Sequence, residues 1–363
     1  IDWTVLTINS SDVDKGDEFD IEALALDDAP TFDLIRSGRA TGLFQLESRG
    51  MQDLIRRLQP SSFEDLIALV ALFRPGPLQS GMVDDFINRK QGREVVRYPH
   101  PGLEPILAAT YGVILYQEQV MRIAQELAGY TLGAADLLRR AMGKKDAAEM
   151  DQQRSVFLEG AIERGVDTRV ANHIFDLMEH FAGYGFNKSH SAAYALLAYR
   201  TAYLKAHYPA EFMASVLTNE GGFYDACAYI EEARRLGIVI LPPHINYSHY
   251  EFFAERSDTI RIGLMQVRGL SRNTIDRIIK IRKEGMFESI HHFLARTVPE
   301  LSEAEILIHC GALDGLGLSR PSMFTEALLW RRKNSQTQTS LPLGIEHRYI
   351  TLPEFSDPTE TDK

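Results

Sequence analysis

Cysteine is scarce in this sequence. Only Cys227 and Cys310 occur among 363 residues, and their separation fits no metal-binding spacing. This scarcity excludes a fold built on a disulfide framework and a zinc site built on cysteine clusters. We therefore expect a reducing compartment and a cytoplasmic location.

Long hydrophobic runs are also lacking. No apolar stretch approaches the roughly 18 residues of a membrane-spanning helix, and no basic segment followed by an apolar one resembles a signal peptide. We expect no membrane association. Hydrophobic residues make up 45% of the chain and charged residues 25%, which is typical of a globular protein of two or three domains.

The chain has no excess of positive charge. Its net charge of -11 argues against a uniformly basic, nucleic-acid-binding surface. The charge is uneven, however. Acidic residues concentrate in the first 30 and last ten positions, whereas basic residues cluster within 139–145 and 268–283. These local patches, rather than the net charge, decide whether the chain can bind a polyanion.

Helical periodicity dominates residues 31–224. One apolar stripe comprises Val120, Ile123, Ala124 and Leu127. A second comprises Val170, Ile174, Leu177, Met178 and Phe181. We interpret both as core positions. A further helix is predicted from Ser189, as its N-cap, to His207.

Short strands are predicted at Ile238–Leu241 and Ile260–Leu264, because β-branched residues gather there between prolines and glycines. The predicted fold is mainly α: a multi-helical domain, a small α/β connector, a helix-hairpin-helix domain and a polar C-terminal tail. The predicted boundaries are residues 1–30 for an irregular acidic lead-in, 31–225 for the helical domain, 226–256 for the connector, 257–330 for tandem hairpins, and 331–363 for the tail.

A first basic cluster spans residues 137–145. Arg139, Arg140 and Lys144 can present several cations to one polyanion, because arginine offers two parallel donors to phosphate oxygens and lysine a compact charge. A solvated basic helix end is the alternative interpretation.

A second cluster spans residues 181–194. Glycines there precede a helix start, which is an anion-binding feature, and Lys188 adds charge. Asn187, Ser189 and His190 add directional hydrogen bonds. A nucleophilic role for Ser189 with His190 is disfavoured, because adjacent helical residues do not face each other. A capped helix with a polar first turn remains the alternative.

Several long segments resemble one known family. They are residues 44–51, 71–78 and 111–119, followed by the two clusters above, in this order. They are similar to the alpha subunit of bacterial DNA polymerase III, the C-family replicase, over about residues 20–345. The resemblance implies that this stretch is the fingers domain. It implies that Arg139, Arg140 and Lys144 contact the triphosphate, and that Asn187, Lys188, Ser189 and His190 line the nucleotide pocket near the sugar.

The family also binds two Mg²⁺ ions on three palm aspartates, which would activate the primer 3′-oxygen. Asp12 and Asp14 have the spacing of two of them but stand in the acidic lead-in. We therefore expect no catalytic residue, no metal and no cofactor in this chain, with Mg²⁺ bound in the parent enzyme outside it. Because Ile1 stands in place of an initiator methionine, we expect an excised fragment that is inactive alone.

A third cluster, residues 267–282, has a helix-hairpin-helix pattern. Gly269 would make the hairpin, backbone N–H groups would bind a DNA phosphate, and basic side chains would add contacts. The predicted DNA-binding residues are Arg268, Gly269, Arg272, Lys280 and Arg282. Residues 308–317 resemble a weaker second hairpin. A hairpin that only packs is the alternative.

A short peptide lies in the polar tail. Gln338, Leu341 and Leu343 resemble the motif that bacterial proteins insert into the sliding clamp. The glutamine would hydrogen-bond the pocket rim, and the leucines would fill an apolar pocket.

The sequence therefore predicts part of a template-directed DNA polymerase that acts in chromosomal replication. Its expected partners are primer-template DNA, an incoming deoxynucleoside triphosphate, the sliding clamp and other replicase subunits. A stand-alone, non-catalytic nucleic-acid-binding module is the main alternative. A phosphate-handling enzyme that uses Ser189 and His190 is a second one.

Overall fold

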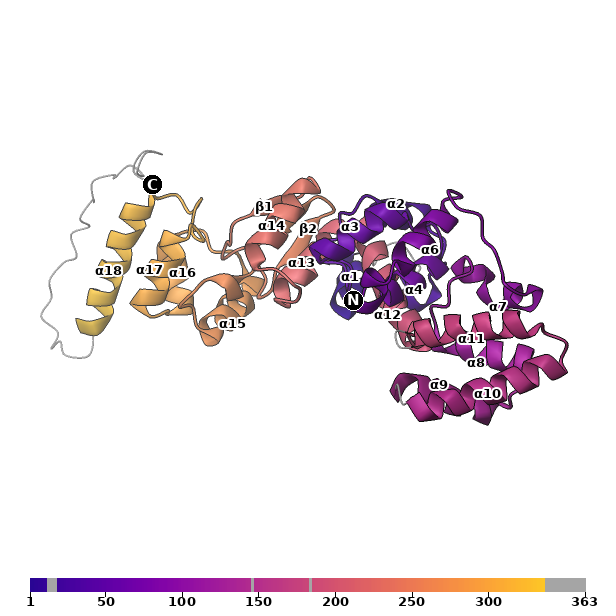
Figure 1. Ribbon diagram of the computed structural model, residues 1–363. Helices are drawn as coiled ribbons and strands as arrows, with labels where there is room; N and C mark the ends of the chain where they lie inside the picture. Colours follow the sequence, from indigo (N-terminus) through magenta and orange to yellow (C-terminus); the bar gives the residue numbers. More distant parts are fainter. Residues whose placement is uncertain (12–17, 145–146, 183–184, 337–363) are drawn as a thin grey trace, which may run out of the picture. The chain divides into compact units, whose positions relative to one another are not determined.

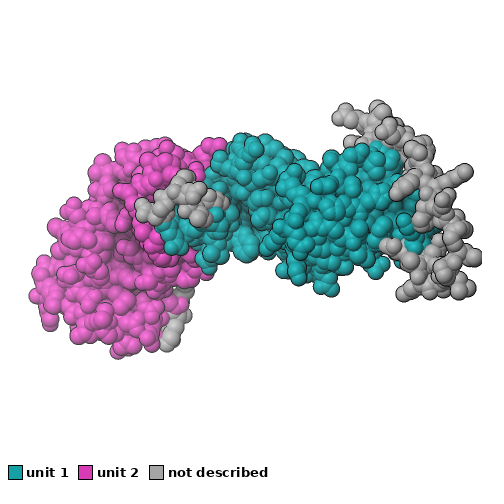
Figure 2. Space-filling model, turned by 180° about the vertical axis from the view of Figure 1, so that it is seen from behind, with its two compact units in different colours: residues 1–19, 208–363 teal, residues 20–207 magenta. Residues whose placement is uncertain are grey.

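The computed structural model describes residues 1–11, 18–144, 147–182 and 185–336. Two compact units divide the chain: Ile1–Phe19 with Tyr208–Lys363 form unit 1, and Asp20–His207 form unit 2 (Figure 2). Helices account for most of the described residues of both units (Figure 1). The predicted mainly α fold is confirmed. The units divide the chain at other positions than the predicted domain boundaries, which stay predictions.

Among the described residues of unit 2, helices and 3-10 turns are the regular elements. Its α-helices are α2 (Ala29–Arg36), α3 (Arg49–Leu58), α4 (Phe63–Leu72), α5 (Pro75–Gln79), α6 (Met82–Lys90), α7 (Glu104–Leu107), α8 (Gln117–Ala128), α9 (Leu132–Lys144), α10 (Ala147–Glu163), α11 (Thr168–Ala182) and α12 (Lys188–His207). Three 3-10 turns, η1 (Ile21–Ala23), η2 (Pro101–Leu103) and η3 (Ala108–Thr110), complete it. Helix α12 packs against α4 and α2, while α8–α11 pack on one another (Figure 1).

The predicted stripe on α8 is core. Val120, Ile123, Ala124 and Leu127 are buried in one cluster with Ile174 and Met178 of α11, as their helical spacing requires. Helix α8 ends at Gly129, whose φ of 69° is a left-handed conformation that glycine adopts at little cost. The apolar periodicity therefore identified buried positions on both helices, and the folded chain shows that they share one core.

The N-cap of helix α12 lies two residues earlier than predicted. The Asn187 side chain accepts the His190 backbone N–H at 2.8 Å, so Asn187, and not Ser189, caps the helix. Asparagine caps as well as serine does, so the sequence alone could not choose between them. The predicted end at His207, ahead of Pro209, is confirmed.

Unit 1 combines helices with one small sheet. Its α-helices are α1 (Asp2–Ser11), α13 (Pro209–Thr218), α14 (Ala226–Arg235), α15 (Arg272–Ile281), α16 (Ile290–Thr297), α17 (Leu301–His309) and α18 (Arg320–Gln336). Its strands are β1 (Val239–Leu241), β2 (Phe253–Arg256) and β3 (Thr259–Arg261), with 3-10 turns η4 (Leu264–Gln266) and η5 (Arg282–Glu284). The strand order is β1-β3-β2, with β1 parallel and β2 antiparallel to β3.

The structure corrects two expectations in unit 1 and adds one strand. Residues 2–11 form helix α1, which packs on α13 and buries Thr4 and Ile8, so the lead-in is not irregular at its start. Strand β2 was not predicted, because four residues that end in Glu255 and Arg256 carry little alternation. Helix α18 continues through Gln336, beyond the predicted start of the polar tail at residue 331.

The hairpin region has its own core. Ile275 and Ile278 of α15 are buried together with Phe293, Leu307 and Ala327 of the following helices. Among the described residues, no helix has the length and apolar character needed to cross a membrane.

Candidate nucleotide and nucleic-acid interfaces

The two arginines of α9 share one carboxylate. Asp136 lies 2.8 Å from Nη2 of Arg139 and 2.8 Å from Nε of Arg140. The hydrogen bond from Arg139 lowers the pKa of Asp136, and the charges of both arginines add to this effect. Arg140 keeps 63% of its side chain exposed, so it can still reach a ligand. The Lys144 side chain lies outside the described part of the chain.

The second predicted cluster lies at the start of α12, on the surface. Asn187, Lys188, Ser189 and His190 are all exposed. The Lys188 backbone N–H donates to both carboxylate oxygens of Glu118, at 3.1 and 3.0 Å. The Asn187 side chain caps His190. Of the first three N–H groups of α12, only that of Ser189 is then left without a partner within the described part of the chain. The helix start alone is therefore a weaker anion site than predicted.

Gln117 connects the two clusters. Its Nε2 donates to the Gly185 carbonyl at 3.1 Å, and its Oε1 accepts from Nη1 of Arg139 at 3.3 Å. Backbone bonds reinforce this junction: Gln117 N donates to Phe186 O at 2.9 Å, and Phe186 N to Leu115 O at 3.1 Å. The structure thus brings Arg139 and the residues leading into α12 to one place.

Aromatic rings extend from this place along α12. The His190 ring lies 5.4 Å from Phe186 and 4.4 Å from Tyr194, and the Arg74 guanidinium lies 4.3 Å above Phe186. Burial lowers the pKa of Arg74. Arg74, Gln117 and Glu118 lie in segments that resemble the family, but the sequence predicted no role for these three residues. Their polar side chains beside buried apolar runs were the available signal.

The structure does not favour a serine nucleophile. The His190 ring contacts other rings, and none of its contacts in the described part of the chain is with a hydroxyl or a carboxylate. A general base needs such a partner on each side. We therefore set aside the phosphate-handling enzyme that would use Ser189 with His190.

Within the described ranges, no group of three or more histidine, cysteine, aspartate or glutamate residues could hold a metal ion. These residues do not fit a two-metal centre, and no catalytic step through Mg²⁺ is derived from them. Asp12 and Asp14 lie outside the described residues.

The first hairpin turns at Gly269. Its φ of 89° favours glycine, and a Cβ there would lie 2.8 Å from Cδ1 of Ile306. The turn leads into α15, whose cap Ser271 accepts the Thr274 N–H. Buried Glu303 accepts the Ser271 N–H at 2.9 Å and the Thr274 hydroxyl at 2.7 Å. These contacts fix the hairpin against α17.

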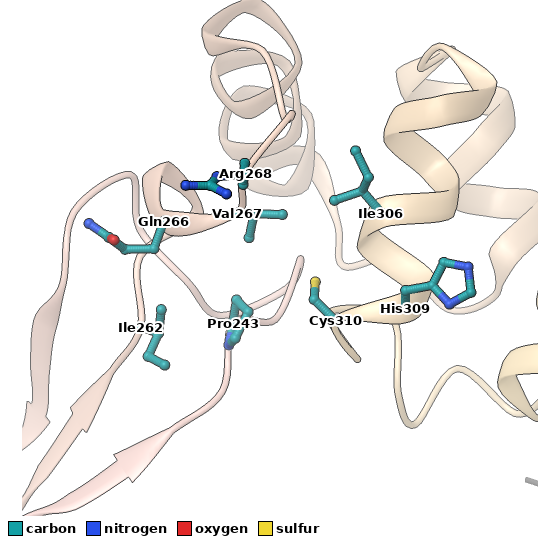
Figure 3. Close-up of a pocket in the computed structure, with 8 residues that line it drawn as sticks. All are labelled: Pro243, Ile262, Gln266, Val267, Arg268, Ile306, His309 and Cys310. Atoms are coloured by element: carbon teal, nitrogen blue, oxygen red, sulfur yellow. The ribbon is translucent and has the colours of Figure 1, made fainter. Parts of the chain in front are cut away.

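The hairpin borders a pocket of about 540 Å³ (Figure 3). Its lining residues are Pro243, Ile262, Gln266, Val267, Arg268, Ile306, His309 and Cys310. Arg268 is exposed. The second hairpin, from Cys310 to Ser319, joins α17 to α18, and Arg320 there donates to Asp314 at 2.9 Å.

The basic side chains near the first hairpin differ in their contacts. Lys280 is exposed. The Arg272 guanidinium stacks 3.7 Å from the Tyr250 ring centre and donates to Asp276 at 3.2 Å. Arg282 donates to the carbonyls of Ile245 at 2.9 Å and Ser248 at 2.6 Å, and burial lowers its pKa. This geometry favours a packing role for Arg282, where the sequence predicted a DNA contact.

Comparison with known proteins agrees with both regions. Residues 1–165 match the bacterial DNA polymerase III alpha subunit finger domain, and residues 237–323 match a helix-hairpin-helix motif. The DNA polymerase III subunit alpha of Escherichia coli strain K12 is 52% identical over 334 residues, which cover 89% of this chain and 29% of the relative. The chain belongs to the family of bacterial DNA polymerase III alpha subunits.

Other alpha subunits give the same result. Those of Vibrio cholerae and Haemophilus influenzae are 47% and 51% identical, over 98% and 99% of this chain and 33% and 32% of the relatives. The chain spans about a third of the length of the curated alpha subunits it matches. The predicted fingers domain followed by a helix-hairpin-helix domain is thereby confirmed. Gln338, Leu341 and Leu343, the predicted clamp-binding residues, lie outside the described residues.

Proposed function

We propose that this chain supplies the nucleotide-binding fingers and a duplex-binding hairpin of a template-directed DNA polymerase, which adds deoxynucleotides to a primer 3′-end in chromosomal replication. The observation that carries the proposal is the junction at Gln117, which joins Arg139 to the segment leading into α12. Two separately predicted phosphate-binding elements of a polymerase family meet there.

The electrostatics of the junction suit an incoming triphosphate. In the described part of the chain, the ion-pair partner of both Arg139 and Arg140 is the partly exposed carboxylate of Asp136, three and four residues earlier on their own helix. Such pairs contribute little. Hydrogen bonds from arginine to phosphate are charge-assisted and can be bidentate. A triphosphate can therefore displace Asp136 from at least one arginine. Lys144 would add a third cation.

The exposed first turn of α12 would face the rest of the nucleotide. Asn187, Ser189 and His190 offer directional hydrogen bonds beside the rings of Phe186 and Tyr194. We place the sugar there, with Lys188 as an additional cation. At the hairpin, Arg268, Lys280 and the backbone around Gly269 would contact duplex phosphates without reading sequence.

Substitution of Arg140 tests the nucleotide site. In the polymerase that contains this chain, Arg140→Ala should raise the KM for deoxynucleotides about tenfold, since a charged hydrogen bond is worth about 1.5–3 kcal/mol. Arg169→Ala, an exposed arginine of α11, is the matched control. Single-nucleotide incorporation kinetics provide the measurement, and equal KM values for Arg140→Ala and wild type would refute the assignment.

The isolated chain belongs in the same assay. With Mg²⁺, deoxynucleotides and primed template it should extend no primer, because we place the catalytic aspartates and their two metal ions elsewhere in the polymerase. Template-dependent extension by the purified chain would overturn that placement and return Asp12 and Asp14 to consideration.

Clamp binding is a separate part of the proposal. Gln338, Leu341 and Leu343 have the residue types of a short peptide that buries few side chains, for which affinities on the order of micromolar are expected. Replacing all three with alanine should abolish binding to a bacterial sliding clamp in a titration. Undiminished binding would leave the motif without a role. The other replicase subunits and the cytoplasmic location stay predictions.

A further inference from the structure

The side-chain amide of Gln117 uses both of its ends. Nε2 donates to the carbonyl of Gly185, before α12, and Oε1 accepts from Arg139, on α9. The amide therefore connects two elements that approach each other from different parts of the sequence. No other hydrogen bond within the described part of the chain joins Arg139 to this segment.

Backbone bonds already hold the Phe186 segment against residues 115–117. Tyr116 and Phe186 form a parallel β-bridge, with a hydrogen bond on each side. The segment therefore does not need the Gln117 side chain to stay in place. What the side chain adds is the orientation of Arg139 relative to α12.

Glu118 acts on the other side of the same junction. Its carboxylate oxygens both accept the Lys188 N–H, the first N–H of α12, and a carboxylate is favourable at this positive end of the helix dipole. The Lys188 ammonium lies 5.5 Å from the Tyr116 ring centre. Consecutive residues thus hold Arg139 and the first turn of α12.

We propose that Gln117 and Glu118 are positioning residues of the nucleotide site. Gln117 fixes Arg139, and Glu118 fixes the first turn of α12, so that the triphosphate and the sugar meet groups held at a set separation. The inference rests on the proposed function. Neither residue touches the nucleotide in this scheme. Misplacement by about 1 Å of a group that holds substrate is enough to reduce rates strongly.

A double-mutant cycle tests Gln117. In the polymerase that contains this chain, Gln117→Ala should lower kcat/KM for nucleotide incorporation about tenfold, as the loss of a hydrogen bond to a charged group predicts. In an Arg139→Ala background the same change should lower kcat/KM less than twofold, because Gln117 acts through Arg139. Gln117→Met, which keeps the side-chain length, repeats the test if the alanine variant does not fold. Gln125→Ala, two turns further along α8, is the control.

Glu118 is tested by rescue. Glu118→Ala should lower kcat/KM about tenfold, whereas Glu118→Gln should stay within about twofold of wild type, because its amide oxygen can accept the Lys188 N–H. A glutamine variant as poor as the alanine variant would show that the charge, and not the hydrogen bond, matters. Glu126→Gln on the same helix is the matched control.

The outcomes separate this inference from the proposed function. If Arg139→Ala itself leaves kcat/KM unchanged, the nucleotide site is wrong. If Arg139→Ala is impaired but Gln117→Ala adds its full effect to it, the nucleotide site stands and the positioning role of Gln117 falls. Less-than-additive effects with rescue by Glu118→Gln support the inference.

Discussion

Glu118 and Glu303 each hold the start of a helix, and they differ in burial. Glu118 accepts the first N–H of α12 from a half-buried position, whereas Glu303 is 7% exposed and accepts the Ser271 N–H and the Thr274 hydroxyl before α15. The same capping chemistry serves two purposes. A half-buried carboxylate can adjust to a ligand, while a buried one with several donors fixes a turn permanently.

The nearby cations differ in the same sense. At the α9–α12 junction, Arg139 and Arg140 are paired at the surface and can exchange partners. Around the hairpin, Arg282 is committed to two backbone carbonyls, and Arg268 is exposed. The number of basic residues in a motif therefore does not tell how many of them are available to bind phosphate.

Removal of Glu303 should have the largest effect. Glu303→Ala leaves the Ser271 N–H and the Thr274 hydroxyl without their acceptor, so the free energy of unfolding should fall by about 3 kcal/mol. Glu305→Ala, on the same helix and partly exposed, should change it by less than about 0.5 kcal/mol. Urea unfolding followed by circular dichroism measures both. Equal stabilities of the two variants would show that the hairpin does not depend on this carboxylate.

The same carboxylate predicts a pH dependence. Burial disfavours the charge of Glu303, but the hydrogen bonds from Ser271 and Thr274 outweigh it and lower the pKa below its ordinary 4.5. A carboxyl whose pKa is lowered in the folded state stabilises the fold fully at pH values above its ordinary, unfolded-state pKa. This contribution is lost as the pH falls through the folded-state pKa. The stability difference between wild type and Glu303→Gln should therefore shrink below pH 4.5.

Substitution of Arg282 should affect stability but not DNA binding, and substitution of Arg268 should affect DNA binding but not stability. Arg282→Ala removes two hydrogen bonds to carbonyls and should lower the free energy of unfolding by about 2 kcal/mol while leaving the salt dependence of DNA binding unchanged. Arg268→Ala should leave stability unchanged and lower the salt slope by about one, the value for one lost phosphate contact. Fluorescence anisotropy of labelled duplex at several salt concentrations provides the slope. The reverse pattern would exchange the two roles.

Sequence patterns singled out most residues of the candidate site but not the contacts that join them. The apolar stripe of α8 and the helix ahead of Pro209 follow from local periodicity and turn residues, and both are present. The clusters around Arg139 and Asn187 were also recognised. That Gln117 joins them was not predictable, because its partners lie 22 and 68 residues away and only the folded chain brings them together.

The errors have physical causes as well. Ser189 and Asn187 are comparable caps, and only the backbone conformation decides between them. The DNA contact predicted for Arg282 stays a prediction. It rested on charge, whereas the folded chain gives this residue the carbonyls of Ile245 and Ser248, which belong to a loop more than 30 residues away. Helix α1 was not predicted, because the acidic residues of the first 30 positions indicated an exposed, irregular segment, whereas Thr4 and Ile8 are buried.

Unit 1 is assembled from two separate stretches of chain, Ile1–Phe19 and Tyr208–Lys363. Phe19 and Tyr208, at the two crossing points, lie with ring centres 5.3 Å apart. During synthesis, α1 leaves the ribosome long before its packing partner α13 has been made. The buried side of α1 therefore stays without its partner while all of unit 2 is translated. At about 5–20 residues per second that wait lasts on the order of ten seconds or more. Unit 2 can fold first, and the closing of its two ends would then deliver α1 to α13.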